Sequence, residues 1–268
     1  MKHILSFSSA SERPRLSLRE DGSNEELELY GEQYFSFSPS RACIGYKGDG
    51  EWHSCANRAV NMRQCPQCQY KDIARIYTVG DFSLYPHMHE TLAREKYIIY
   101  LAQFGADITK VGLTRRSRLN ERWREQGADF AAAILEFDGP DDAYPAEQLL
   151  QSSLDVVGAV RASQKFKRLH FDKAKAKAKL AKTIQIVQSD LKFDSYRAEC
   201  EVKDMLGHYP AVSNPEPVDF VGGKILGAKG AWLFFEGPSG QHYGSDMHMQ
   251  VGHFIEKKAE TALAQQIL

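Results

Sequence analysis

The sequence lacks a long hydrophobic run and has almost no net charge. No stretch of its 268 residues approaches the length of a membrane-spanning helix. The apolar stretch at the start, within MKHILSFSSASERPR, is too short for a secretory signal. We therefore expect a cytoplasmic protein without a membrane partner. A net charge of −1 argues against a protein whose whole surface is basic and binds nucleic acid. Local basic patches are still compatible with this net charge.

Cysteine is scarce outside one block. Four of the five cysteines lie in CIGYKGDGEWHSCANRAVNMRQCPQC, namely Cys43, Cys55, Cys65 and Cys68. The last two form a two-residue knuckle that lets two thiolates meet on one ion, while a long Gly-rich loop separates the first two. A reducing compartment disfavours disulfides, and a redox CxxC would need a strand before it and a helix after it. We predict a structural zinc site, in which His53 could replace one thiolate, and we interpret Cys200 as a buried or idle thiol.

Four segments follow from changes in pattern along the chain. Hydrophobic residues make up 43% and charged residues 26%, which is ordinary for a soluble globular protein. The predicted segments are an N-terminal β segment (1–42), a zinc-binding region (43–80), a strand-and-helix domain with a helical extension (92–205) and a small β domain (215–268). Residues 208–220 hold three prolines and read as a linker between the last two.

The two terminal segments are β-rich. RLSLRE and LELYGEQYFSFSP alternate apolar and polar residues, and Gly31 marks a turn or bulge in the second. Residues 220–255 read as short strands with glycine turns, which predicts an antiparallel sheet or barrel. EKKAETALAQQIL, at 256–268, reads as a short helix.

The segment from 97 to 155 is the most informative. YIIYLA and ITKVGLT are predicted strands, residues 116–126 have a helical pattern that Gly127 would end, AAAILEF is a third strand, and Pro145 opens a second helix. Further along, residues 161–191 read as helical, with Leu180, Ile184, Val187 and Leu191 on one stripe.

This segment resembles the GIY-YIG nuclease superfamily. Ile98-Ile99-Tyr100 and Lys110-Val111-Gly112 stand where the two signature triplets belong, followed by Arg122 and Glu147. Ile98 replaces the first glycine, and Lys110 replaces the second tyrosine. The resemblance covers about a fifth of the chain and implies an α+β fold: a small mixed sheet with flanking helices, beside a zinc-knuckle insertion and the terminal β structure. Most of the chain is also similar to an uncharacterised prokaryotic family in which YLA, KVG, RW and QGA follow a cysteine cluster.

Phosphodiester hydrolysis would assign a role to each of these four residues. Tyr100 would orient or deprotonate water, with Lys110 lowering its pKa. Arg122 offers a planar guanidinium group whose N–H groups can bind phosphate oxygens, and Glu147 offers a carboxylate that can bind Mg²⁺ or Mn²⁺. The same residues also suit ordinary roles: a core aromatic, a solvated edge lysine and a surface ion pair.

Basic residues gather near this predicted site. Besides Lys110 and Arg122 they are Arg115, Arg116, Arg118, Arg124, Lys165, Lys167 and Arg168, a set that could form one surface for a DNA or RNA backbone. Trp123 and Phe166 are candidates for base stacking or for core packing. Three functions remain open: a metal-dependent endonuclease, a catalytically silent zinc-containing DNA- or RNA-binding module, and a protein-interaction scaffold.

Overall fold

A computed structural model describes residues 1–79 and 82–258. The chain divides into two compact units, one formed by Met1–Pro86 with Pro210–Leu268 and the other by His87–Tyr209. The two terminal β segments and the cysteine block therefore share the first unit, and the predicted strand-and-helix domain supplies the second. Within the described residues, no helix is both long and apolar enough to cross a membrane.

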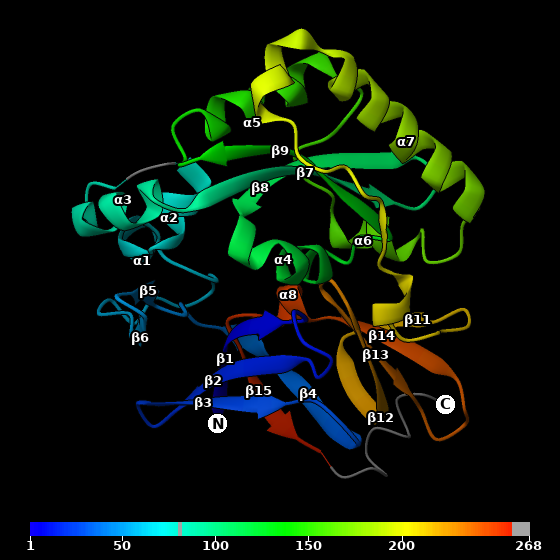
Figure 1. The fold of residues 1–268 in the computed structure, drawn as a ribbon. Helices are drawn as coiled ribbons and strands as arrows, with labels where there is room; N and C mark the ends of the chain where they lie inside the picture. Colours follow the sequence, from blue (N-terminus) through cyan, green and yellow to red (C-terminus); the bar gives the residue numbers. More distant parts are fainter. Residues whose placement is uncertain (80–81, 259–268) are drawn as a thin grey trace. The chain divides into compact units, whose positions relative to one another are not determined.

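The first unit contains a nine-stranded sheet in the order β11-β14-β13-β12-β4-β15-β1-β2-β3 (Figure 1). The strands are β1 (Lys2–Ser8), β2 (Arg15–Glu20), β3 (Ser23–Glu28), β4 (Glu32–Arg41), β11 (Glu216–Val218), β12 (Phe220–Lys229), β13 (Trp232–Glu236), β14 (His242–Asp246) and β15 (His253–Lys257). Only the β11–β14 pair is parallel among these described strands. The antiparallel sheet predicted from the terminal segments is confirmed, and strands from the two ends of the sequence alternate in its middle.

Alternating side chains place the core of this sheet on one face. Leu16 and Leu18 of β2 pack with Phe35 of β4 and Phe235 of β13 in one buried cluster, as the period of two in these strands requires. Gly223 adopts φ +147°, and a Cβ there would lie 2.0 Å from the carbonyl oxygen of Glu236. Only glycine permits this approach of β12 to β13. The short helix α8 (Met247–Gln250) begins after β14 and buries Met247.

The cysteine block folds as a hairpin followed by short helices. Strands β5 (Tyr46–Gly48) and β6 (Glu51–His53) pair antiparallel, and α1 (Pro66–Lys71) and α2 (Ala74–Val79) follow. Asp49 and Gly50 both have positive φ, the conformation of a two-residue hairpin turn. The Gly-rich stretch between Cys43 and Cys55 is therefore a β-hairpin rather than a simple loop.

The second unit is built on a four-stranded antiparallel sheet in the order β10-β9-β7-β8. Its strands are β7 (Lys96–Phe104), β8 (Ile108–Arg115), β9 (Phe130–Asp138) and β10 (Lys203–Asp204). Its helices are α3 (Pro86–Ala93), η1 (Arg116–Arg118), α4 (Leu119–Gln126), α5 (Ala143–Ser153), α6 (Ala162–Phe166), α7 (Lys173–Ser189), η2 (Leu191–Tyr196) and η3 (Leu206–His208). The predicted order of strand, strand, helix, strand and helix is confirmed, and Gly127 ends α4 with φ +68°.

Helices pack against both faces of this sheet. Alternate residues of β7 point in opposite directions, so Ile99 joins a core with Leu150 of α5 and Leu180 of α7. Tyr100 joins a second core with Trp123 of α4. The protein is therefore an α+β protein, and the three sheets of the described residues are predominantly antiparallel.

Two helix predictions differ from the structure. The pattern over 161–191 is interrupted, because the Asp172 side chain accepts from the Lys175 N–H and starts α7 as a new helix. Leu191, the last residue of the predicted apolar stripe, is 81% exposed because α7 already ends at Ser189. A helix was also predicted over 256–268. Residues 256 and 257 belong instead to strand β15, and residues 259–268 lie outside the described residues.

Candidate functional site

The four predicted cysteine ligands meet at one point. The Sγ atoms of Cys43, Cys55, Cys65 and Cys68 all lie within 4.8 Å of one another, and Cys55 Sγ is 3.8 Å from Cys65 Sγ. Tetrahedral zinc with Zn–S bonds of about 2.3 Å separates its sulfurs by roughly 3.8 Å. The geometry and the four-thiol donor set therefore fit one metal ion. Within the described residues, no other group of this kind is found.

Backbone geometry holds the sulfurs in place. Cys65 is the N-cap of α1, and Pro66 occupies its first turn, so Cys68 returns to the same side one helical turn later. The N–H groups of Gly45 and Cys65 donate to Cys43 Sγ over 3.4 and 3.2 Å. Gly45 has φ +80°, and a Cβ there would lie 1.8 Å from the His53 carbonyl oxygen. The loop at Cys43 therefore requires glycine.

The thiols differ in acidity. Burial works to raise the pKa of Cys55, but the Ala59 N–H and the neighbouring thiols lower it to about 7. Burial raises the pKa of Cys43, and it also raises that of Cys68. Because metal binding needs thiolates, an ion at this cluster would displace protons from the more buried cysteines.

Neither His53, the alternative zinc ligand, nor the fifth cysteine, Cys200, joins the cluster. The His53 ring stacks on Tyr46 at 4.7 Å, and its Nε2 lies 3.3 Å from the Gly48 carbonyl oxygen. Cys200 belongs to the second unit, where the Gln188 amide donates to its sulfur over 2.9 Å. Burial raises the pKa of Cys200, which agrees with an idle thiol.

The second candidate site begins at the β7–β8 pair. Tyr100 lies opposite Gly112, and Lys110 lies opposite Ala102 two residues away, so both side chains share one face. A Cβ on Gly112 would lie 2.5 Å from the Tyr100 hydroxyl and 2.9 Å from Lys110 Nζ. Glycine at 112 therefore provides the space in which the phenol and the ammonium approach each other. Lys110 Nζ also lies 5.8 Å from the centre of the Tyr100 ring.

Arg122 and Glu147 reach the same place from two helices. Arg122 of α4 interacts with the Tyr100 hydroxyl and pairs with Glu125 at 3.3 Å. Glu147 of α5 accepts from the Leu113 N–H and interacts electrostatically with Lys110 and Arg122. The structure thus brings Tyr100, Lys110, Arg122 and Glu147 together, and we call them the Tyr100 cluster. Arg122 is 44% exposed, whereas Tyr100 has no exposed surface.

Acidities in the Tyr100 cluster differ from the sequence-based expectation. Burial raises the pKa of Tyr100 to about 12, and Arg122 offsets only part of this effect. The expected lowering of this pKa by Lys110 is therefore not found, because desolvation dominates. Burial lowers the pKa of Lys110 to about 8, against an opposing effect of Glu147. Burial likewise raises the pKa of Glu147, although Lys110 and the Leu113 N–H work against it.

One member of the site was missed by the sequence analysis. Gln126 Nε2 donates to the Tyr100 hydroxyl over 2.6 Å, and both residues are buried. Gln126 lies four residues after Arg122 on α4, so the two occupy the same face of the helix. The spacing of four residues from Arg122 is the sequence feature that could have identified Gln126 as a member of the site.

The predicted basic residues are largely engaged by other groups. Arg115 pairs with Glu95 at 2.6 Å, Arg116 with Glu136, Arg118 with Glu125 at 2.8 Å and Arg168 with Asp107 at 2.7 Å. Arg124 contacts the His208 ring at 3.0 Å, and Lys165 donates to the Gln126 carbonyl over 2.7 Å. Lys167 is exposed just after α6. Acidic partners thus neutralise much of the charge that the sequence suggested for a nucleic-acid surface.

These features define an α+β protein with a four-cysteine centre of the metal-binding type and a separate, partly buried Tyr100 cluster. The chain belongs to the family described as Protein of unknown function (DUF2797), whose model matches residues 35–240. That range includes both sites. No curated protein and no solved structure matches the chain.

Proposed function

We propose that this protein binds nucleic acid and hydrolyses phosphodiester bonds with the help of a divalent metal, as its resemblance to the GIY-YIG nucleases implies. The observation that supports the proposal is the convergence of the Tyr100 cluster. Its members come from β7, β8, α4 and α5, in the order and on the elements that the resemblance predicts.

Each side chain has a role that follows from its surroundings. Arg122 is charged and accessible, so it binds phosphate oxygens. Tyr100, with a pKa of about 12, stays neutral near pH 7, and to orient water its buried hydroxyl would have to exchange its bond with Gln126 for one with the water molecule. Lys110, with a pKa of about 8, is the better proton acceptor near neutral pH. Glu147 would hold Mg²⁺ or Mn²⁺, which when bound supplies Lewis-acid stabilisation of the leaving oxygen.

We propose that zinc occupies the four-cysteine centre in a structural role. Four thiolates complete a tetrahedral shell and leave no open position for water or substrate. The ion would link the loop at Cys43, the end of the β5–β6 hairpin at Cys55 and the start of α1 at Cys65.

The test is incubation of the purified protein with single-stranded, duplex and structured DNA and RNA in the presence of Mg²⁺ or Mn²⁺. We expect cleavage by the native protein and its loss in Glu147→Ala. The matched control is Asp155→Ala, which removes a 99% exposed carboxylate shortly after α5. Cleavage that persists in Glu147→Ala would reject the site. A rate that rises with pH toward about 8 and then levels would agree with Lys110 as the proton acceptor.

A second candidate function is binding of DNA or RNA without catalysis. The observation in its favour is the complete burial of Tyr100, whose hydroxyl is already bonded to Gln126. Salt-dependent binding with no cleavage under either metal would select this function. Absence of binding to every nucleic acid would exclude both functions and leave the interaction scaffold.

A further inference from the structure

A cavity of about 450 Å³ lies within the first unit, where residues of β1, the cysteine block and α2 line it. Its apolar surface comes from the buried side chains of Leu5 and Ile44 and from the half-buried Trp52 of β6. Its polar surface includes Arg63, Gln69 and Thr78. Ligand sites in proteins typically occupy about 300–1,000 Å³ and combine apolar surface with a few polar groups. The cavity therefore has the size and the mixed surface of a small-molecule site.

The acid in this wall is already engaged by the protein. Among the described residues that line the cavity, Asp72 is the only one with a carboxylate. Its Oδ2 accepts from the Lys47 N–H and from Gln64 Nε2 over 3.2 and 2.7 Å, and its Oδ1 accepts from the Ala74 N–H over 2.9 Å. These bonds hold the carboxylate in place, and it forms no ion pair with Arg63.

Arg63 is an accessible cation that lacks a counter-ion. Its side chain is exposed, and no hydrogen bond or ion pair of its guanidinium is found among residues 1–79 and 82–258. Partial burial and the positive charge of Arg41 lower the pKa of Arg63, and Asp72 works against them. Arg41 donates to His253 Nε2 and to the Met249 carbonyl oxygen, not to a carboxylate. An anion in the cavity would relieve the repulsion between these two cations.

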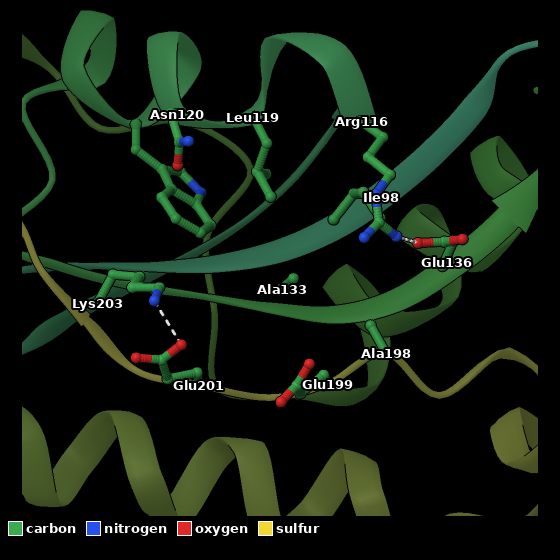
Figure 2. A pocket seen from close by; sticks show the side chains of 11 residues that line it. Ile98, Arg116, Leu119, Asn120, Ala133, Glu136, Ala198, Glu199, Glu201 and Lys203 are labelled. Carbon is green, nitrogen blue, oxygen red and sulfur yellow. Dashed lines mark hydrogen bonds and ion pairs between the residues drawn. The ribbon is translucent and has the colours of Figure 1, made fainter.

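The cavity beside α4 in the second unit has the opposite character. Its cations are neutralised, because Arg116 pairs with Glu136 and Lys203 pairs with Glu201 (Figure 2). An anion there would have to displace a carboxylate. Of these two cavities, the one in the first unit is therefore suited to an anionic ligand.

We propose that the cavity of the first unit binds a nucleoside monophosphate, either as a free nucleotide or as one unit of a nucleic-acid strand. The phosphate would bind Arg63, whose planar guanidinium can donate two parallel hydrogen bonds to phosphate oxygens. The base would pack against Trp52, since aromatic side chains stack on bases of every kind. Leu5 and Ile44 supply the apolar surface for the rest of the ring.

This inference goes beyond the proposed hydrolysis and does not need it. The cavity lies in the first unit, and none of its lining residues belongs to the Tyr100 cluster. It adjoins the four-cysteine centre in the sequence, because Ile44 follows Cys43 and Gln64 precedes Cys65. The fold of the cysteine block therefore shapes the site.

The test is an NMR titration of the full chain, observed at the indole N–H of Trp52. The chain has three tryptophans, and the resonance that is lost in Trp52→Phe assigns this one. We expect a saturable shift with adenosine or uridine monophosphate. The matching nucleoside and inorganic phosphate should each bind at least about tenfold more weakly, because each makes only part of the contacts. A trinucleotide that binds more tightly than the monophosphate would identify a strand as the ligand, and weaker binding would identify a free nucleotide.

Substitutions of Arg63 test the phosphate contact. Arg63→Gln should weaken nucleotide binding by at least about tenfold. Arg63→Lys should weaken it less, because lysine keeps the charge and loses the planar guanidinium. The matched control is Arg58→Gln, which removes an exposed arginine of the same block that does not line the cavity and should leave the affinity unchanged. Thermal unfolding midpoints show that each variant is folded.

Three results would overturn the proposal. They are an unmoved Trp52 resonance at millimolar nucleotide, equal affinity for inorganic phosphate, and full affinity in Arg63→Gln. Glu147→Ala separates this proposal from the hydrolytic one, because it should abolish cleavage and retain nucleotide binding. Absence of cleavage in every assay, with nucleotide binding intact, would reject only the hydrolytic function.

Discussion

Removal of metal from the four-cysteine centre should unfold residues 46–72 and leave the sheet of the second unit intact. The cluster has little apolar core of its own: among residues 1–79 and 82–258, Tyr46, Cys55 and Ala59 are the only ones that pack there besides Cys43, Cys65 and Cys68. Burial of one large apolar side chain contributes about 1.5–3 kcal/mol, whereas zinc binding to small structural sites contributes about 10–16 kcal/mol. The ion would therefore be the main stabilising contribution in this segment.

Hydrogen exchange with peptide resolution can measure this effect. After chelation, or in Cys68→Ser, peptides from 46–72 should lose protection, while peptides from β7 should keep theirs. Native mass spectrometry should show one zinc ion for the native chain and none for Cys68→Ser. Cys200→Ser is the matched control, since this thiol lies outside the cluster and should leave the zinc content unchanged. Unchanged protection of residues 46–72 after loss of metal would refute the reasoning.

Three further predictions concern the Tyr100 cluster. Gly112→Ala places a methyl group 2.5 Å from the Tyr100 hydroxyl, so urea unfolding should show a loss of about 1–3 kcal/mol; an unchanged midpoint would contradict this packing. Tyr100→Phe removes the partner of the buried Gln126 amide and should cost about 1–3 kcal/mol, with native stability as the contrary result. The pKa of Lys110 is near 8 in the folded chain against an ordinary 10.5, so the unfolded chain binds more protons between these values. Stability relative to Lys110→Met should therefore rise from pH 8 to 10.5, and parallel curves for the two proteins would exclude a lowered pKa.

Local features of the fold were predictable because they depend on neighbouring residues. The β-branched run YIIYLA predicted β7, and Gly127 marked the end of α4. The spacing of Cys65 and Cys68 likewise predicted the metal-type centre, since two residues between cysteines fix their relative positions.

Other features depend on long-range pairing, which local patterns do not encode. The contact of Tyr100 with Gln126 requires the packing of β7 against α4, and the acidic partner of Arg116 lies on β9. A count of basic residues therefore overestimated the free positive charge near the site. The high pKa of Tyr100 was missed for the same reason, because burial is a property of the assembled core.

The pairing of β4 has a consequence for how the protein is made. This strand lies between β12 and β15, and β1 also pairs with β15, so β1 and β4 find these neighbours only after the residues between them have been made. Roughly 180 residues separate β4 from β12, a delay on the order of ten seconds or more on the ribosome. Strand edges left open for that time invite pairing with other chains. The nascent chain should therefore depend on chaperones more than the finished protein does, and production at lower temperature should improve its yield.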